Sequence, residues 1–272
     1  MKNLILLVVF IITLSAFGQK HNNSTGFSEN KGQIIDQKGK ANPSVLYLLN
    51  SNGLNVQLKK NGFSYDIYES KKQPTKKEKN KKPQVFFDSK KEILDDYTYE
   101  YLYHRIDIDF IDSNTDVKLI AENKSKDYDN YYTVPNAPDG VLRISKYKKV
   151  TYKNLYNNID AVFFVPQDST KTIEYNFIIH PGGKISDIRM KFNGAETKLY
   201  DNKIKMQVRF GEMEEILPLS WVETGNEQSK INVGYKRIRK NLYGFESPEN
   251  LQNKTIVIDP VPIRLWGTYY GG

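Results

Sequence analysis

Residues 54–68 read LNVQLKKNGFSYDIY, and this stretch decides the fold class. Apolar and polar residues alternate on both sides of Asn61-Gly62, which is the pattern of two half-buried β-strands. Asn-Gly favours a type I′ turn, so we expect a two-residue hairpin loop at that point. Such a loop pairs Leu58 with Tyr65 and places the apolar residues of both strands on one face.

The same alternation recurs along most of the chain, and no helical pattern longer than about ten residues follows residue 18. Closely spaced short strands with turn residues between them predict an all-β, antiparallel, sandwich-like fold with little helix. One domain and two packed β subdomains both fit this pattern. Residues 111–140 are polar and rich in turn residues, and we expect them to form loops. Further strands are expected at 97–110, 150–165, 173–179, 188–192, 204–210, 219–223, 231–238, 242–246 and 255–258.

The strand expected at 97–110 changes its apolar parity half-way. Four tyrosines hold odd positions, and the apolar residues from Ile106 onward hold even ones. This change predicts a bulge or strand break at His104-Arg105. We expect the tyrosine stripe to pack as core; the alternative is an exposed stripe that stacks on sugar rings or contacts protein. The stripe consists of Tyr97, Tyr99, Tyr101 and Tyr103.

The N-terminus carries an export signal. A single lysine precedes an apolar run from Leu4 to Leu14, and small residues end the segment. The run is shorter than the roughly 20 residues of a membrane-spanning helix, so residues 1–18 are predicted to be a signal peptide and no transmembrane anchor is expected. The expected organisation of the rest is a first β module at 24–165, a second at 166–262 and the start of a truncated repeat region at 263–272.

The net charge of +8 is concentrated in one segment. Residues 71–82 contain seven lysines and one glutamate, which gives them a net charge of +6. Such blocks are typically solvated, so we expect a disordered loop at about 71–92 and no nucleic-acid partner. A weaker alternative is that this loop binds anionic polysaccharide or lipid. The chain has no cysteine, which excludes disulfides, thiolate catalysis and thiolate zinc sites.

Candidate chemistry is sparse. Four carboxylates within ten residues are weak calcium candidates, although their spacing does not match an EF-hand loop. Asp160 and Asp259 lie beside apolar runs, where a carboxylate can act as a general acid, but capping of a turn is the preferred role. No zinc-hydrolase motif and no nucleophile elbow occur. No cofactor is predicted. The calcium candidates are Asp107, Asp109, Asp112 and Asp116.

Several segments together resemble one known family, the uncharacterised N-terminal domain of large secreted Bacteroidota proteins. In that family the domain precedes SBBP-type β-propeller repeats and gliding-motility-associated or type IX sorting C-termini. The resemblance covers nearly all of residues 27–272 and brings no catalytic or binding residue with it. The segments are FSENKGQ (27–33), HRIDIDF (104–110), NYY (130–132), YKKVTYKNLYNNID (147–160), IEYNF with PG (173–177, 181–182) and IVIDP with WGTYYGG (256–260, 266–272).

These observations lead to a function hypothesis. We expect a non-catalytic structural or interaction module of an exported cell-surface protein, which supports or presents downstream repeats in adhesion or envelope biology. Its expected partners are a surface glycan or an envelope protein and, in a longer chain, a downstream propeller domain. The alternative is a secreted carbohydrate-active or other hydrolase with a dispersed carboxylate site, for which two facing carboxylates are required.

Overall fold

Strands form almost all of the regular structure. The computed structural model describes residues 25–36, 38–51, 53–74, 97–135, 137–168, 171–251 and 253–265. Over these residues every strand pairing is antiparallel, and the only helix is the short 3-10 turn η1 (Ile185–Asp187), so the all-β prediction is confirmed. The strands are β1 (Phe27–Glu29), β2 (Val45–Ser51), β3 (Leu54–Lys59), β4 (Gly62–Pro74), β5 (Tyr97–Phe110), β6 (Lys118–Tyr131), β7 (Val141–Tyr156), β8 (Ile159–Phe164), β9 (Glu174–Ile179), β10 (Met190–Asn193), β11 (Glu196–Tyr200), β12 (Lys203–Val208), β13 (Gly211–Thr224), β14 (Glu227–Lys230), β15 (Gly234–Arg239), β16 (Leu242–Glu246) and β17 (Thr255–Arg264).

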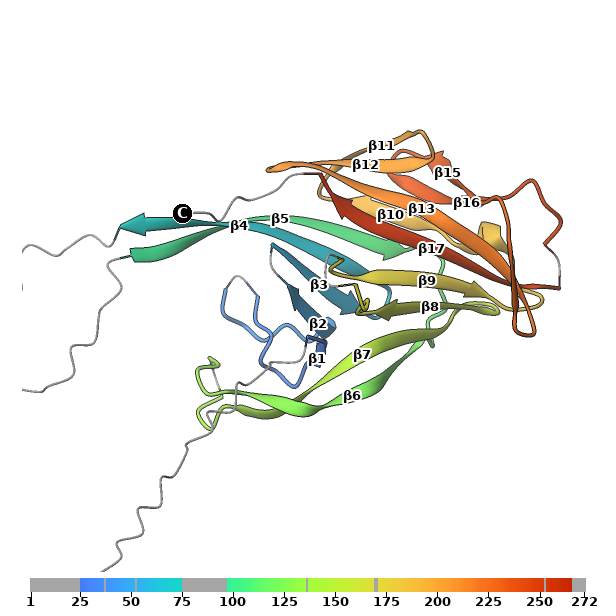
Figure 1. Ribbon diagram of the computed structural model, residues 1–272. Helices are drawn as coiled ribbons and strands as arrows, with labels where there is room; N and C mark the ends of the chain where they lie inside the picture. Colours follow the sequence, from blue (N-terminus) through green and yellow to red (C-terminus); the bar gives the residue numbers. More distant parts are fainter. Residues whose placement is uncertain are drawn as a thin grey trace, which may run out of the picture.

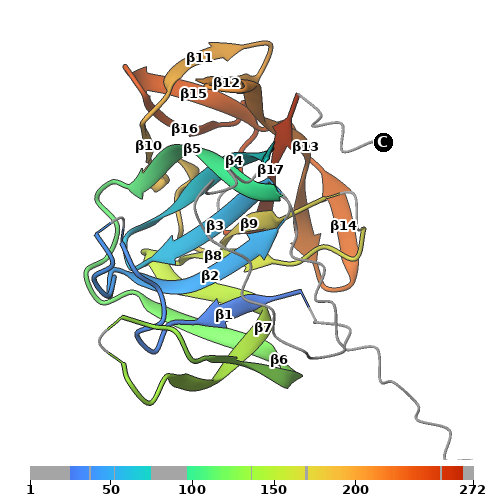
Figure 2. The same cartoon turned by 90° about the vertical axis from the view of Figure 1, so that its left-hand side faces the viewer.

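The sheet divides at β7. Strand β6 pairs with one edge of β7, while β1 and β8 pair with its other edge, one after the other. From β1 the hydrogen bonding continues through β2, β3, β4, β5, β10 and β16 to β15. From β8 it continues through β9, β17, β13 and β12 to β11, with β14 also on β13. Figures 1 and 2 place β6 and β7 at one end of the molecule and β11, β12 and β15 at the opposite end.

The two arms of the sheet pack against each other through their inner faces. The ring of Phe63 on β4 lies 5.0 Å from that of Phe163 on β8 and 5.4 Å from that of Tyr175 on β9. One cluster of buried apolar side chains extends from Phe27 on β1 to Ile258 on β17. The fold is therefore sandwich-like, while hydrogen bonds connect all its described strands into a single sheet.

The opening hairpin exists, but its predicted register is wrong by two residues. Lys59 pairs with Gly62, so the loop is Lys60-Asn61, and Leu58 pairs with Phe63 instead of Tyr65. Neither loop residue has the positive φ that a type I′ turn needs. The glycine serves another purpose: a Cβ on Gly62 would lie 2.3 Å from the carbonyl oxygen of Ile108 on β5. A shift of two residues keeps the same side chains inside, so the face was predicted correctly.

Residues 111–140 are not all loop, which corrects the prediction for that region. β6 pairs with β7 across two register shifts. All of its side chains are exposed or half-buried, on both faces. Because it lies at the edge of the sheet with little to cover it, hydrogen bonding to β7 holds it without an apolar alternation.

The long hairpin β4–β5 corrects two more predictions. Its register runs without a shift from Gly62↔Asp109 to Pro74↔Tyr97, so no bulge interrupts β5 at His104-Arg105. β4 includes the first four residues of the predicted Lys-rich loop, 71–74, and the rest of that loop, to about residue 92, lies outside the described residues. The parity change has a different cause. The even side chains from Ile106 onward face the core where β5 crosses the body, and Tyr99, Tyr101 and Tyr103 are exposed on the other face.

The predicted division at residue 165 is crossed by two hydrogen-bonded ladders. β8 pairs with β9, and β5 pairs with β10. Whether 24–165 and 166–262 fold as separate modules stays a prediction. The predicted signal peptide at 1–18 lies outside the described residues, as does 266–272 of the predicted repeat start. No helix in the described part is both long and apolar enough to cross a membrane.

Candidate functional site

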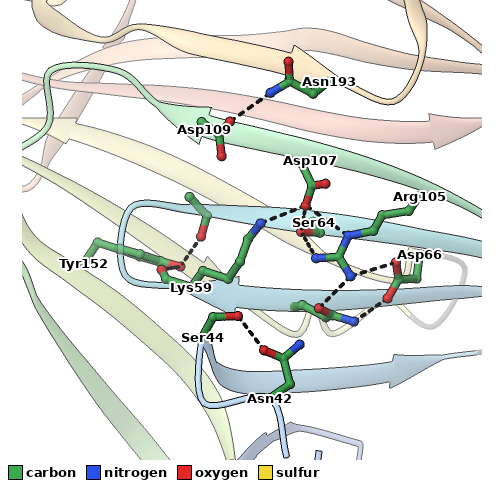
Figure 3. Close-up of polar contacts among 12 residues, drawn as sticks. Asn42, Ser44, Lys59, Ser64, Asp66, Arg105, Asp107, Asp109, Tyr152 and Asn193 are labelled. Carbon is green, nitrogen blue, oxygen red and sulfur yellow. Dashed lines mark hydrogen bonds and ion pairs between the residues drawn. The ribbon is translucent and has the colours of Figure 1, made fainter. Parts of the chain in front are cut away.

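A connected set of polar side chains covers the outer face of β3, β4 and β5 (Figure 3). The alternation that sends apolar residues of these strands into the core sends the intervening polar residues outward. Because the three strands are neighbours in the sheet, their outward residues come together although they are far apart in sequence. We call this set the polar face; it consists of Gln57, Lys59, Ser64, Asp66, Arg105 and Asp107.

Asp107 is the acceptor at the centre of the polar face. Its Oδ1 accepts hydrogen bonds from Lys59 Nζ at 2.8 Å, from Ser64 Oγ at 2.6 Å and from Arg105 Nε at 3.0 Å. Partial burial opposes ionisation, but the hydrogen bonds from Lys59 and Ser64 outweigh it and hold the pKa of Asp107 below its usual value. Asp107 therefore stays a carboxylate at neutral pH.

Arg105 connects the two carboxylates of the face. Besides Asp107 it donates to Gln57 Oε1 at 3.1 Å and to Ser64 Oγ at 3.0 Å, and its guanidinium lies 3.5 Å from Asp66 Oδ1. Gln57 also donates to Asp66. Burial raises the pKa of Asp66, and the guanidinium only partly offsets this. The side chains thus fix one another in a single arrangement before any partner binds.

Replacing Arg105 tests this network. In Arg105→Leu, two partly buried carboxylates lose their shared cation, so we expect the free energy of unfolding at about pH 7 to fall by about 1–3 kcal/mol. The loss should shrink as the pH falls and Asp66 and Asp107 become protonated. Urea unfolding across this pH range measures it, with the exposed Arg237→Leu as the matched control. An equal loss in both variants would contradict the role of Arg105.

A row of tyrosines continues the polar face along the hairpin. The Tyr68 and Tyr103 rings lie 5.6 Å apart, Tyr68 and Tyr101 6.0 Å apart, and Tyr101 and Tyr103 6.4 Å apart. Tyr99, Tyr101 and Tyr103 are 54%, 52% and 53% exposed, so the prediction that the stripe packs as core is wrong. We call Tyr68, Tyr99, Tyr101 and Tyr103 the tyrosine ribbon. The side chain of Tyr97 is not described.

The strand segments that carry the ribbon extend beyond the body of the sheet, as Figure 1 shows. β3 pairs with β4 only as far as Ile67, and β10 pairs with β5 only from Asp107 onward. Tyr68 still donates its N–H to the Gly53 carbonyl at 3.1 Å, and within the described part of the chain the strand pairing of 69–74 is with β5 alone. His104 holds the base of this extension: its Nδ1 accepts from the Arg209 N–H at 3.1 Å and its Nε2 contacts the Gly194 carbonyl at 2.9 Å.

The structure does not bring the four calcium candidates together. Asp107 is held in the polar face, Asp109 accepts from Asn193 at 2.8 Å, and Asp112 pairs with Arg189 at 2.6 Å. Asp116 is exposed. In the described residues no three His, Cys, Asp or Glu side chains are grouped as metal ligands.

The two other carboxylates singled out in the sequence have different surroundings. Asp160 accepts from the Asn154 N–H at 2.7 Å and from Lys153 at 2.6 Å, and its Oδ2 lies 2.9 Å from His180 Nε2. These bonds outweigh the effect of burial and hold its pKa below the usual value, in keeping with a structural turn role. Asp259 differs: burial, reinforced by the charge of Glu174, raises its pKa to about 6.

Glu215 on β13 is a buried carboxylate that the sequence reading missed. It is fully inaccessible, and it accepts hydrogen bonds from Tyr65 at 2.8 Å and Tyr175 at 3.0 Å. Burial raises its pKa to about 7, and the two tyrosines only partly counter this. The sequence did hold one signal for it. Glu215 lies two residues after Met213, so in a strand both side chains point to the same face, which is the core face. Glu215 joins the two arms from inside and is closed to substrates.

The chain matches a family model over most of its length. A family model described as a domain of unknown function (DUF7948) matches residues 27–261. No curated protein and no solved structure matches the chain.

Proposed function

Because the chain belongs to the DUF7948 family of domains of unknown function, we propose a role from its geometry. It is a non-catalytic interaction module of an exported cell-surface protein, and it binds a surface glycan. The glycan lies along the tyrosine ribbon and the polar face beside it. The signal peptide predicted at residues 1–18 and the resemblance to secreted Bacteroidota proteins with downstream repeats support the setting, in which the module presents or supports such repeats.

The observation that carries this proposal is the half-exposed tyrosine ribbon. Burying such rings in the core would be favourable, and here the rings of Tyr99, Tyr101 and Tyr103 are more than half exposed. A tyrosine offers a flat apolar surface with a polar tip, which suits the C–H face of a sugar ring. The adjoining carboxylates, amide and guanidinium supply the directional hydrogen bonds that sugar hydroxyls need. Stacking and polar recognition are thus adjacent on one surface.

The hydrolase alternative is favoured by one observation. Asp66 has a raised pKa and Asp107 a lowered one, and such a split is typical of an acid–base pair. Against it, the Arg105 guanidinium contacts both carboxylates, so it occupies the place where a scissile bond would have to lie. Neither aspartate lines any of four cavities found among the described residues. Glycan cleavage that Asp107→Asn abolishes would establish the alternative.

A microarray of bacterial surface glycans tests the proposal. We expect the wild type to bind a subset of glycans and the double variant Tyr101→Ala/Tyr103→Ala to bind them at least about tenfold more weakly. The exposed Tyr128→Ala on β6 is the matched control and should bind normally. The melting temperatures should agree closely, because all three side chains are more than half exposed. The ribbon is not the site if the double variant binds like the wild type, and glycan is not the partner if the wild type binds none.

A further inference from the structure

A cavity of about 490 Å³ lies between η1, strands β15 and β16, and the chain after β16. This volume is within the range of small-molecule sites. The cavity is separate from the polar face and the tyrosine ribbon, since it shares no residue with them. Its apolar wall consists of Ile185, Ile238, Gly244, Phe245, Leu251 and Ile256.

Packing contacts behind the apolar wall fix the positions of its side chains. Phe245 stacks on Tyr235 at 5.1 Å and contacts Phe177 at 5.6 Å, which fixes its ring in the core. A Cβ at Gly244 would lie 2.7 Å from the carbonyl oxygen of Ile188, so a glycine is required for η1 to approach β16 this closely. Ile238 remains 43% exposed on the cavity side of β15.

Three cations and two carboxylates surround this wall. Lys236 pairs with Glu246 at 3.2 Å, and Arg189 pairs with Asp112 at 2.6 Å. Glu249 accepts the Asn232 N–H at 2.7 Å. The Lys184 ammonium alone has no hydrogen-bond or ion-pair partner among the described residues. With both ion pairs neutral, Lys184 and Glu249 are the two charged groups left without an opposite charge, and of these only Lys184 has no polar partner for its side chain in the described part of the chain. Lys184 is therefore the group open to an anionic part of a ligand.

We propose that this cavity binds a small anionic amphiphile, that is, a molecule with an apolar or aromatic body and one carboxylate or sulfonate group. The body packs against Ile238, Phe245 and Leu251, and the anion pairs with Lys184. This assignment is independent of glycan binding at the tyrosine ribbon, because the two surfaces use different residues.

Two fluorescent probes that differ by one charge test the proposal. 1-Anilinonaphthalene-8-sulfonate is anionic, and N-phenyl-1-naphthylamine is the same ring system without the sulfonate. We expect Lys184→Ala to weaken binding of the anionic probe at least about threefold and to leave the neutral probe unchanged. Ile238→Ser should weaken both probes. Lys118→Ala on the edge strand β6, at a residue that does not line the cavity, should affect neither.

The outcomes separate cleanly. If the wild type binds neither probe, or if Lys184→Ala and Ile238→Ser bind both probes like the wild type, the cavity is not the site. If Lys184→Ala weakens both probes equally, the anion does not pair with Lys184 and the assignment of ligand charge is wrong. Unchanged glycan binding in both variants would show that the two surfaces act separately. Melting temperatures of the variants check that each remains folded.

Discussion

Raising the pH from about 4.5 to about 8 should destabilise this protein, and Glu215→Gln should remove much of that effect. Glu215 is fully buried, and its pKa is raised from 4.5 to about 7. Between those values the folded state holds a proton that the unfolded state has released. The free energy of unfolding therefore falls as the pH rises through this window, and it levels off above about pH 7. A shift of this size corresponds to about 3 kcal/mol.

The groups facing Glu215 do not titrate in this window. Tyr65, Tyr175 and Tyr235 are buried, and burial raises the pKa of each of them well above 10. Asp259, with a pKa raised to about 6, changes stability in the same direction as Glu215. The difference between wild type and Glu215→Gln, measured at each pH, therefore isolates the contribution of Glu215.

Urea unfolding from about pH 4.5 to about pH 8 gives the answer. The variant should be more stable than the wild type at pH 8, because it carries no charge into the core, and the advantage should diminish toward pH 4.5. Tyr65→Phe removes one of the two bonds that the carboxylate accepts, so it should cost more stability at pH 8 than at pH 4.5. Parallel pH profiles for wild type and Glu215→Gln would contradict a raised pKa in the folded protein.

Truncating Phe63 should cause the largest loss of stability from a single side chain. Phe63 is fully buried and contacts the rings of Phe110, Phe163 and Tyr175, so it packs between the two arms of the sheet. Phe63→Ala removes this ring and leaves a cavity that rigid strands cannot close. We expect the free energy of unfolding to fall by about 3–5 kcal/mol.

The control for this experiment is an aromatic residue of the same hairpin that faces outward. Tyr99 is 54% exposed, and Tyr99→Ala should cost less than about 1 kcal/mol. Thermal or urea unfolding of both variants gives the comparison. Similar losses in the two variants would mean that the packing between the arms, or the outward placement of the tyrosine ribbon, is wrong.

The sequence predicts fold class and buried faces well, and register less well. The alternation around Asn61-Gly62 identified the hairpin and its inner face. The alternation could not place the loop. Gly62 is a glycine because Ile108 on β5 lies close to it, and the residue pattern of one hairpin does not show which other strand will lie beside it. The edge strand β6 was missed because neither of its faces is consistently buried, so no alternation was selected.

The candidate site could be predicted only in part. The tyrosine stripe was visible, but its exposure depends on β4 and β5 continuing past β3 and β10, which is a property of strand lengths in three dimensions. Arg105 and Asp107 lie two residues apart in the segment HRIDIDF (104–110), which carries part of the family resemblance. Their partners Lys59 and Ser64 are separated from them by more than forty residues, and only the paired register brings them together.

The most direct test of the central claim follows the tyrosine rings themselves while glycan binds. In an NMR titration with a glycan selected on the microarray, the ring signals of Tyr101 and Tyr103 should shift in proportion to the bound fraction. The ring signals of the buried Tyr65 and Tyr175 should stay unchanged. Saturable binding of the glycan that leaves the Tyr101 and Tyr103 signals in place would contradict the account.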